Sequence, residues 1–156
     1  MDRTPEQFRE RERLIRESVA AQGFMRLVGA KLEEIRPGHC VLAVDRRPDL
    51  LQHNGLFHGG VTAFLVDNGT TIAAATVLPP GKAPLTAEYK INLIAAAVGE
   101  RLICRARVVK PGRTLTVVAA DVFHLVDGAE KQSATALATI AIVDADALAR
   151  SPPGKE

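Results

Sequence analysis

Asp67 is the only ionisable side chain in the segment 59–80, which is otherwise made of uncharged residues. A carboxylate in such surroundings is costly to bury unless it is paired, hydrogen-bonded or open to a substrate cavity. Under one interpretation, it accepts hydrogen bonds from the nearby Asn68, Thr70 or Thr71 and only fixes the local structure. Under the other, it acts as a general base or nucleophile toward a bound electrophile.

The same segment opens with the sequence His58-Gly59-Gly60. If a helix begins here, the backbone N–H groups of the two glycines are free of side-chain obstruction. They can then stabilise a developing oxyanion by hydrogen bonds and by the helix dipole. The alternatives are that the glycines only relieve backbone strain at the helix start, and that His58 is a structural hydrogen-bonding residue. The sequence therefore offers an oxyanion-hole candidate beside a possible base.

The segment itself can be interpreted as a helix or as a strand. In the strand interpretation residues 61–66 are extended and Asp67-Asn68-Gly69 is a solvated turn. The helix is favoured because an Ala-rich run, residues 72–78, continues the segment up to a stop at Pro79-Pro80. Such a helix is apolar nearly all round, so we expect it inside a core.

The rest of the chain has the period and the turns of a β-rich domain. Turn chemistry at Pro37-Gly38 predicts a hairpin between residues 31–35 and 40–44, and residues 85–94 form a further β-like run. Turns at 110–113 and 127–128 separate three long strands, predicted at 102–109, 114–123 and 133–143. The predicted fold is α+β, with about six antiparallel strands wrapped around one central helix.

An additional helix is predicted at the N-terminus. Thr4 and Gln7 have the spacing of a capping box, and the helix is expected to run to Gly23 on the domain surface. We therefore divide the chain into an N-terminal helical extension, residues 1–27, and one domain, residues 28–147. Residues 148–156 are expected to be a disordered tail.

Composition and charge exclude several functional classes. A net charge of +2 is too balanced for the basic surface that nucleic-acid binding requires. Cys40 and Cys104 lack metal-ligand spacing and are expected to be buried, inert thiols, so no metal is predicted. The charged N-terminus does not read as a secretory signal, and no apolar stretch is long enough to span a membrane. We expect a cytoplasmic protein.

The pattern Gln52-x-x-Gly55-x-x-His58-Gly59-Gly60, with Asp67 nine residues after the histidine, resembles the signature of hotdog-fold thioesterases of the phenylacetate-degradation type. The likeness extends over roughly residues 28–143. Its specific part is the Asp at this spacing, because the strands alone would fit many β-rich folds.

The resemblance implies hydrolysis of an acyl-CoA thioester. It implies that the Gly59 N–H and the Gln52 side chain polarise the carbonyl, that Asp67 of the neighbouring subunit activates water or attacks directly, and that Thr86 orients the water. Many relatives have Asn where this chain has Gln52, and Asn54 is a possible substitute. The alternative for Thr86 is an ordinary strand threonine.

The resemblance also implies a homodimer, or a dimer of dimers, with sites between subunits. Lys110 and Arg113 would lie along the CoA nucleotide, unless they are only a solvated hairpin tip. No cofactor is needed, because CoA is part of the substrate. A hotdog hydratase or dehydratase and a non-catalytic acyl-CoA sensor are the alternative functions, and an aryl or a medium-chain aliphatic acyl group would fit equally well.

Overall fold

Six antiparallel strands form a single sheet in the computed structural model, which describes residues 4–149. In sheet order β1-β2-β4-β5-β6-β3, the strands are β1 (Ala30–Arg36), β2 (His39–Asp45), β4 (Arg101–Lys110), β5 (Leu115–Val126), β6 (Ala129–Asp144) and β3 (Lys82–Leu93). Strands β4, β5 and β6 are consecutive in the chain and adjacent in the sheet, as expected for a meander. The predicted α+β class and the number of strands are confirmed.

The turns lie where the sequence places them. Pro37-Gly38 joins β1 to β2, and Asp127-Gly128 joins β5 to β6. Asp127 and Gly128 both have positive φ, 51° and 75°, which is the backbone geometry of a two-residue type I′ hairpin turn. This turn matches the twist of β5 and β6 and so helps to hold their register.

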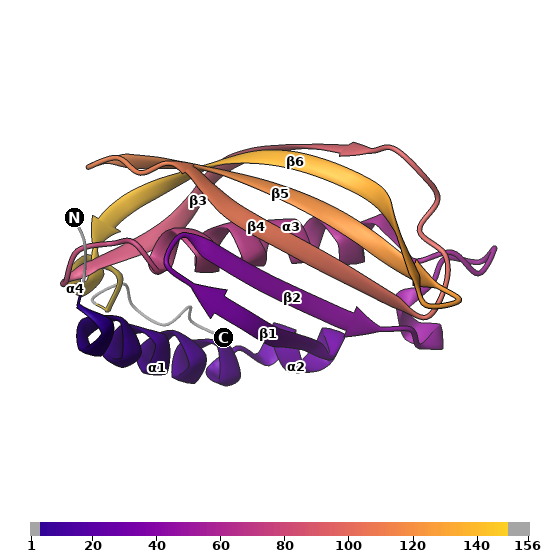
Figure 1. Cartoon of the computed structure of the whole chain (residues 1–156), viewed down its shortest axis with the longest axis horizontal. Coiled ribbons are helices and arrows are strands. Elements are labelled where there is room, and N and C mark those ends of the chain that lie inside the picture. The colour runs from indigo at the N-terminus through magenta and orange to yellow at the C-terminus, as the bar shows by residue number, and fades with distance from the viewer. Residues whose placement is uncertain (1–3, 150–156) are drawn as a thin grey trace, which may run out of the picture.

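The central helix, α3 (Gly59–Ala75), packs against one face of the sheet (Figure 1). Leu65 and Val66 have no exposed surface, and Gly69 allows the helix to approach β4 closely. A Cβ atom on Gly69 would lie 3.3 Å from Sγ of Cys104. The helix interpretation of this segment is confirmed, and the strand interpretation is wrong.

The N-terminal extension contains two helices rather than the one predicted. Helix α1 (Pro5–Ala21) begins with the predicted capping box of Thr4 and Gln7. The chain is extended at Gln22, and a short second helix, α2 (Gly23–Val28), follows. Both helices lie beside β1 (Figure 1) and bury apolar side chains there, among them Ile15, Val19, Met25 and Val28. Burial of Met25 and Val28 sustains α2, which is too short to be stable alone.

The predicted boundaries can be compared with these elements. Helix α2 ends at Val28 and β1 begins at Ala30, next to the boundary expected between residues 27 and 28. A short helix, α4 (Ala145–Ala149), includes residues 148 and 149 of the segment expected to be a tail. The rest of that segment lies outside the described residues. No helix within residues 4–149 is long and apolar enough to cross a membrane.

Cys40 and Cys104 are buried, free thiols on adjacent strands. Burial raises the pKa of Cys104 to about 12 and raises that of Cys40 well above its usual value. Because the thiolate is the reactive form, both cysteines are inert core residues at neutral pH, as the sequence indicated.

Candidate active site

Asp67 lies halfway along α3 and is half-buried. Its Oδ1 accepts a hydrogen bond of 2.6 Å from the hydroxyl of Thr86 on β3. Oγ1 of Thr86 lies 2.9 Å from Oγ1 of Thr71, one helical turn after Asp67. A hydroxyl has one proton to donate, so Thr71 donates to Thr86 while Thr86 donates to the carboxylate. The two threonines therefore form a short donor chain that orients Asp67.

Two of the three residues expected to hold Asp67 in a purely structural role, Asn68 and Thr70, have other partners. The Asn68 amide donates to Oε1 of Gln22 at 3.1 Å, and the Thr70 hydroxyl donates to the backbone carbonyl of Asp67 at 3.0 Å. Neither reaches the carboxylate. Among residues 4–149, only Thr86 bonds this carboxylate, which leaves its other oxygen for an additional partner.

His58 is the N-cap of α3. Its Nδ1 accepts a hydrogen bond of 2.9 Å from the Gly60 N–H, so this nitrogen carries no proton. The Gly60 N–H, predicted to be available to substrate, is thereby used within the cap. The Gly59 N–H has no hydrogen-bond partner among residues 4–149. Of the two glycine donors considered, Gly59 is the one left for a ligand.

Gln52 and Gly59 line one cavity of about 340 Å³. The loop before α3 is held in place by hydrogen bonds from Phe57 N–H to the Ala97 carbonyl, 2.9 Å, and from His58 N–H to the Leu50 carbonyl, 2.8 Å. Asn54 is exposed and is not among the residues that line this cavity. The structure therefore brings Gln52, rather than Asn54, to the helix N-terminus.

Gly59 and Asp67 of one chain are too far apart to act on one carbonyl. They are eight residues apart on one helix, and at 1.5 Å per residue this is about 12 Å. A thioester carbonyl bound at Gly59 is therefore out of reach of water held by Asp67 of the same chain. The predicted catalytic residues form two groups within one chain, Gln52 with Gly59 and Asp67 with Thr86.

Lys110 and Arg113 lie toward the end of the sheet that carries Thr86, the hydrogen-bond partner of Asp67. Thr86 on β3 and Thr116 on β5 both pair with Ile140 of β6, one from each side. The residue after Thr116 pairs with Lys110. Gln52 and Gly59, in contrast, share their cavity with Ser133, whose hydroxyl bonds Val122 farther along β5. The exposed turn 110–113 is thus nearer to the Asp67 group than to the Gly59 group.

Comparison with known proteins places these features in a family. The sequence profile of the Thioesterase superfamily matches residues 54–130, a range that includes Gly59, Asp67 and Thr86. A crystal structure of a thioesterase family protein from Silicibacter pomeroyi is 35% identical, with a TM-score of 0.83, and the match covers 88% of this chain and 98% of that one. This chain belongs to the thioesterase superfamily. It is a thioester hydrolase.

Two other relatives of this thioesterase extend the comparison. Human acyl-coenzyme A thioesterase 13 is 28% identical over 117 residues, which is 74% of this chain and 83% of the human protein. The PaaI protein from the phenylacetic acid degradation operon of E. coli is 15% identical with a TM-score of 0.76, covering 86% and 94% of the two chains. The latter likeness concerns the fold alone. The predicted hotdog fold is confirmed.

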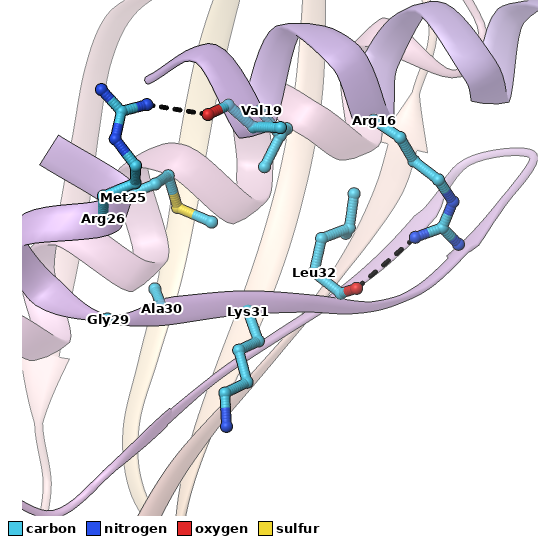
Figure 2. Close-up of a pocket in the computed structure, with 9 residues that line it drawn as sticks. Arg16, Val19, Met25, Arg26, Gly29, Ala30, Lys31 and Leu32 are labelled. Carbon is cyan, nitrogen blue, oxygen red and sulfur yellow. Dashed lines mark hydrogen bonds between the residues drawn. The ribbon is translucent and has the colours of Figure 1, made fainter. Parts of the chain in front are cut away.

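A larger cavity in this thioesterase, about 440 Å³, lies between the N-terminal extension and β1 (Figure 2). The described residues that line it include no carboxylate, histidine, cysteine or hydroxyl group. Figure 2 shows the guanidinium groups of Arg16 and Arg26 each pointing to a backbone carbonyl. Arg16 donates to the Leu32 carbonyl at 3.5 Å and Arg26 to the Ala20 carbonyl at 2.8 Å. This cavity offers no group that could hydrolyse a thioester, so the smaller cavity is the better candidate.

The sequence interpretation missed some residues of the smaller cavity. Thr62 follows Gly59 by three residues on α3, and Ser133 lies on β6. The helical spacing could have identified Thr62, whereas only the strand register places Ser133 there. Residues 4–149 contain no cluster of three His, Cys, Asp or Glu side chains suited to a metal ion.

Proposed function

We propose that this thioesterase hydrolyses acyl-CoA at a site shared by two subunits. Gly59 and Gln52 of one subunit would bind the thioester carbonyl, and Asp67 of the other would activate the attacking water. The observation that carries the proposal is the distance of about 12 Å between Gly59 and Asp67 on one helix, which a second subunit can bridge. The human relative named an acyl-coenzyme A thioesterase supports CoA as the thiol.

The proposed reaction uses only groups of the protein, substrate and water. The carboxylate of Asp67 takes a proton as the water oxygen bonds to the carbonyl carbon. Negative charge then develops on the carbonyl oxygen, where the Gly59 N–H and the Gln52 amide stabilise it. The C–S bond breaks, and the CoA thiolate takes up a proton. Asp67 could instead attack the carbonyl directly, with water hydrolysing the resulting anhydride.

In the proposed dimer, the two subunits contact each other through strand β3. It is at the edge of the sheet and carries Thr86, so pairing it with β3 of a second copy would bring the two Asp67 groups near the dimer axis. Tyr89 and Leu93, on the same strand, are 37% and 59% exposed in the single chain. An edge strand with exposed apolar side chains favours self-association.

The first test is release of free thiol from a panel of acetyl-, hexanoyl-, benzoyl- and phenylacetyl-CoA. We expect turnover of at least one substrate, and a loss of about 10²-fold or more in the Asp67→Asn variant, which keeps the shape but not the base. A hydratase would leave every thioester intact, and a sensor would bind acyl-CoA without turnover. Either result would overturn the proposal.

The shared site is tested by complementation. Asp67→Asn and Gln52→Ala subunits, each nearly inactive alone, are co-expressed with different tags. Mixed dimers contain one intact site, so random pairing should restore about a quarter of the parent activity. Failure of purified mixed dimers to regain activity would show that each site is built from one subunit.

A further inference from the structure

We infer that the N-terminal extension selects the acyl group, with Phe24 of α2 forming the far end of the acyl site. This inference rests on the proposed function, because it takes Asp67 as the group that activates water. It assigns a role in specificity to residues 5–28, which lie outside the part of the chain matched by the family profile. The favoured substrates are acyl groups long or bulky enough to reach Phe24.

The first observation is an aromatic contact between the extension and the central helix. The rings of Phe24 and Phe64 are 4.9 Å apart, centroid to centroid, and meet edge to face at 72°. Phe64 is on α3, three residues before Asp67, so the two side chains lie on the same face of the helix about 5–6 Å apart at Cβ. Phe24 still has 57% of its surface exposed.

Two hydrogen bonds hold the extension along α3. Oε1 of Gln22, at the junction of α1 and α2, accepts from the amide of Asn68 at 3.1 Å. At the C-terminal end of α3, the guanidinium of Arg11 donates to the Ala75 carbonyl at 3.2 Å. Both bonds lie after Asp67 in the sequence of α3, and the Phe24–Phe64 contact lies before it, so the three contacts together hold Phe24 beside this helix.

The helix geometry places an open stripe between the extension and β3. Successive residues are rotated by about 100° around the helix axis. Viewed along this axis, Asn68 lies some 40° to one side of Phe64, and Asp67 lies some 60° to the other side. Asn68 contacts the extension, whereas Asp67 contacts Thr86 on β3. Phe64 itself is only half-buried. The stripe beside the Asp67 carboxylate thus has an apolar floor at Phe64 and an aromatic side wall at Phe24.

The acyl group is the substrate part that this stripe can receive. Its carbonyl carbon must lie within reach of water bound to Asp67, so its apolar tail begins one helical turn from Phe64. In the other direction along α3, the residue one turn from Asp67 is Thr71, a polar residue whose hydroxyl bonds Thr86. An apolar tail is therefore better accommodated toward Phe64 and Phe24. A tail of about five carbons or more spans one turn, whereas an acetyl group does not.

The test compares hexanoyl-CoA with acetyl-CoA in Phe24→Ala and Phe24→Leu variants. Phe24→Ala should lower kcat/KM for hexanoyl-CoA about 10-fold, since the loss of apolar contact in a specificity pocket has effects of this size. The acetyl-CoA value should stay within about twofold, because that substrate does not reach Phe24. Phe24→Leu, which keeps an apolar side chain, should retain most of the hexanoyl preference.

Leu137→Ala is the matched control. Leu137 is 52% exposed, but its buried strand neighbours Ala136 and Ala138 face inward, so it lies on the sheet face away from α3. The ratio of kcat/KM for hexanoyl-CoA to that for acetyl-CoA should be the same in Leu137→Ala as in the parent. If Phe24→Ala lowers kcat/KM equally for hexanoyl-CoA and acetyl-CoA, or for neither, the inference is wrong while the proposed function stands. A parent enzyme that releases no thiol from any acyl-CoA would instead overturn both.

Discussion

The hydroxyl of Thr86 donates a 2.6 Å hydrogen bond to Oδ1 of Asp67, across the contact between β3 and α3. Hydrogen bonds to an ionised carboxylate are stronger than neutral ones, and this one holds one oxygen while leaving the other for water. Thr71 supports it from the helix, 2.9 Å from the Thr86 hydroxyl. We infer from this hydrogen bond that Thr86 positions Asp67, and the following variants test that role.

Thr86→Val should therefore lower kcat by about 10-fold, because it keeps the shape of the side chain but removes the donor to Asp67. Thr86→Ser keeps the hydroxyl and should stay close to the parent. Steady-state kinetics on the best acyl-CoA from the panel would measure both. Equal loss in the Val and Ser variants would indicate that the methyl group, through packing, is what matters.

Gln52→Ala should lower kcat by about 10²-fold with a smaller change in KM, because an oxyanion donor acts most strongly as charge develops in the transition state. Asn54→Ala is the matched control, since Asn54 is exposed and does not line the cavity that Gln52 shares with Gly59. It should stay near the parent values. If Gln52→Ala keeps the parent kcat while Asn54→Ala loses it, the oxyanion donor is Asn54 rather than Gln52.

The two interpretations of His58 predict different outcomes. As the N-cap of α3, His58 can be replaced by Asn, whose side chain also accepts from a backbone N–H in the first turn. His58→Asn should keep most activity and stability, whereas His58→Ala should lose about 1 kcal/mol of unfolding free energy. Urea denaturation and thiol-release kinetics measure the two effects. A stable but inactive His58→Asn variant would make His58 a catalytic base.

Replacing both Lys110 and Arg113 by Ala should raise KM for acyl-CoA while kcat stays within a few-fold. The proposed contacts to CoA phosphates are alike in the ground and transition states, so their loss weakens binding without slowing the chemical step. The parent's advantage should shrink as salt rises, because exposed charge pairs are screened.

A truncated substrate provides the control for this double variant. With a pantetheine thioester that carries the same acyl group but no nucleotide, the double variant and the parent should have equal kcat/KM. Equal losses on both substrates would mean that the turn 110–113 supports the fold or the dimer, and the CoA contact would have to be abandoned.

The amino-acid sequence alone determined the main elements of this thioesterase. The turn at Asp127-Gly128 was predictable because few residues adopt its positive φ values, 51° and 75°. The central helix was predictable because an Ala-rich run, residues 72–78, continues the segment up to Pro79. The resemblance to hotdog thioesterases grouped Asp67, Gly59 and Gln52 in one motif, because the pattern that carries it is local in the chain.

The second N-terminal helix was beyond the sequence interpretation. Gly23 has the chemistry of a helix stop, and a six-residue helix has too little intrinsic stability to be predicted from propensity. Its existence depends on burial of Met25 and Val28 against the rest of the molecule, at 3% and 6% exposure. Contacts with residues distant in the chain decided this element.

Tertiary structure likewise decided how the site is divided. The motif places Gly59 eight residues before Asp67, and only a continuous helix turns that spacing into a separation of about 12 Å. Thr86 lies 19 residues after Asp67, and the strand that carries it is positioned by its antiparallel register with β6. A hydrogen bond depends on distances of a few tenths of an ångström, which arise from packing and strand register rather than from residue order.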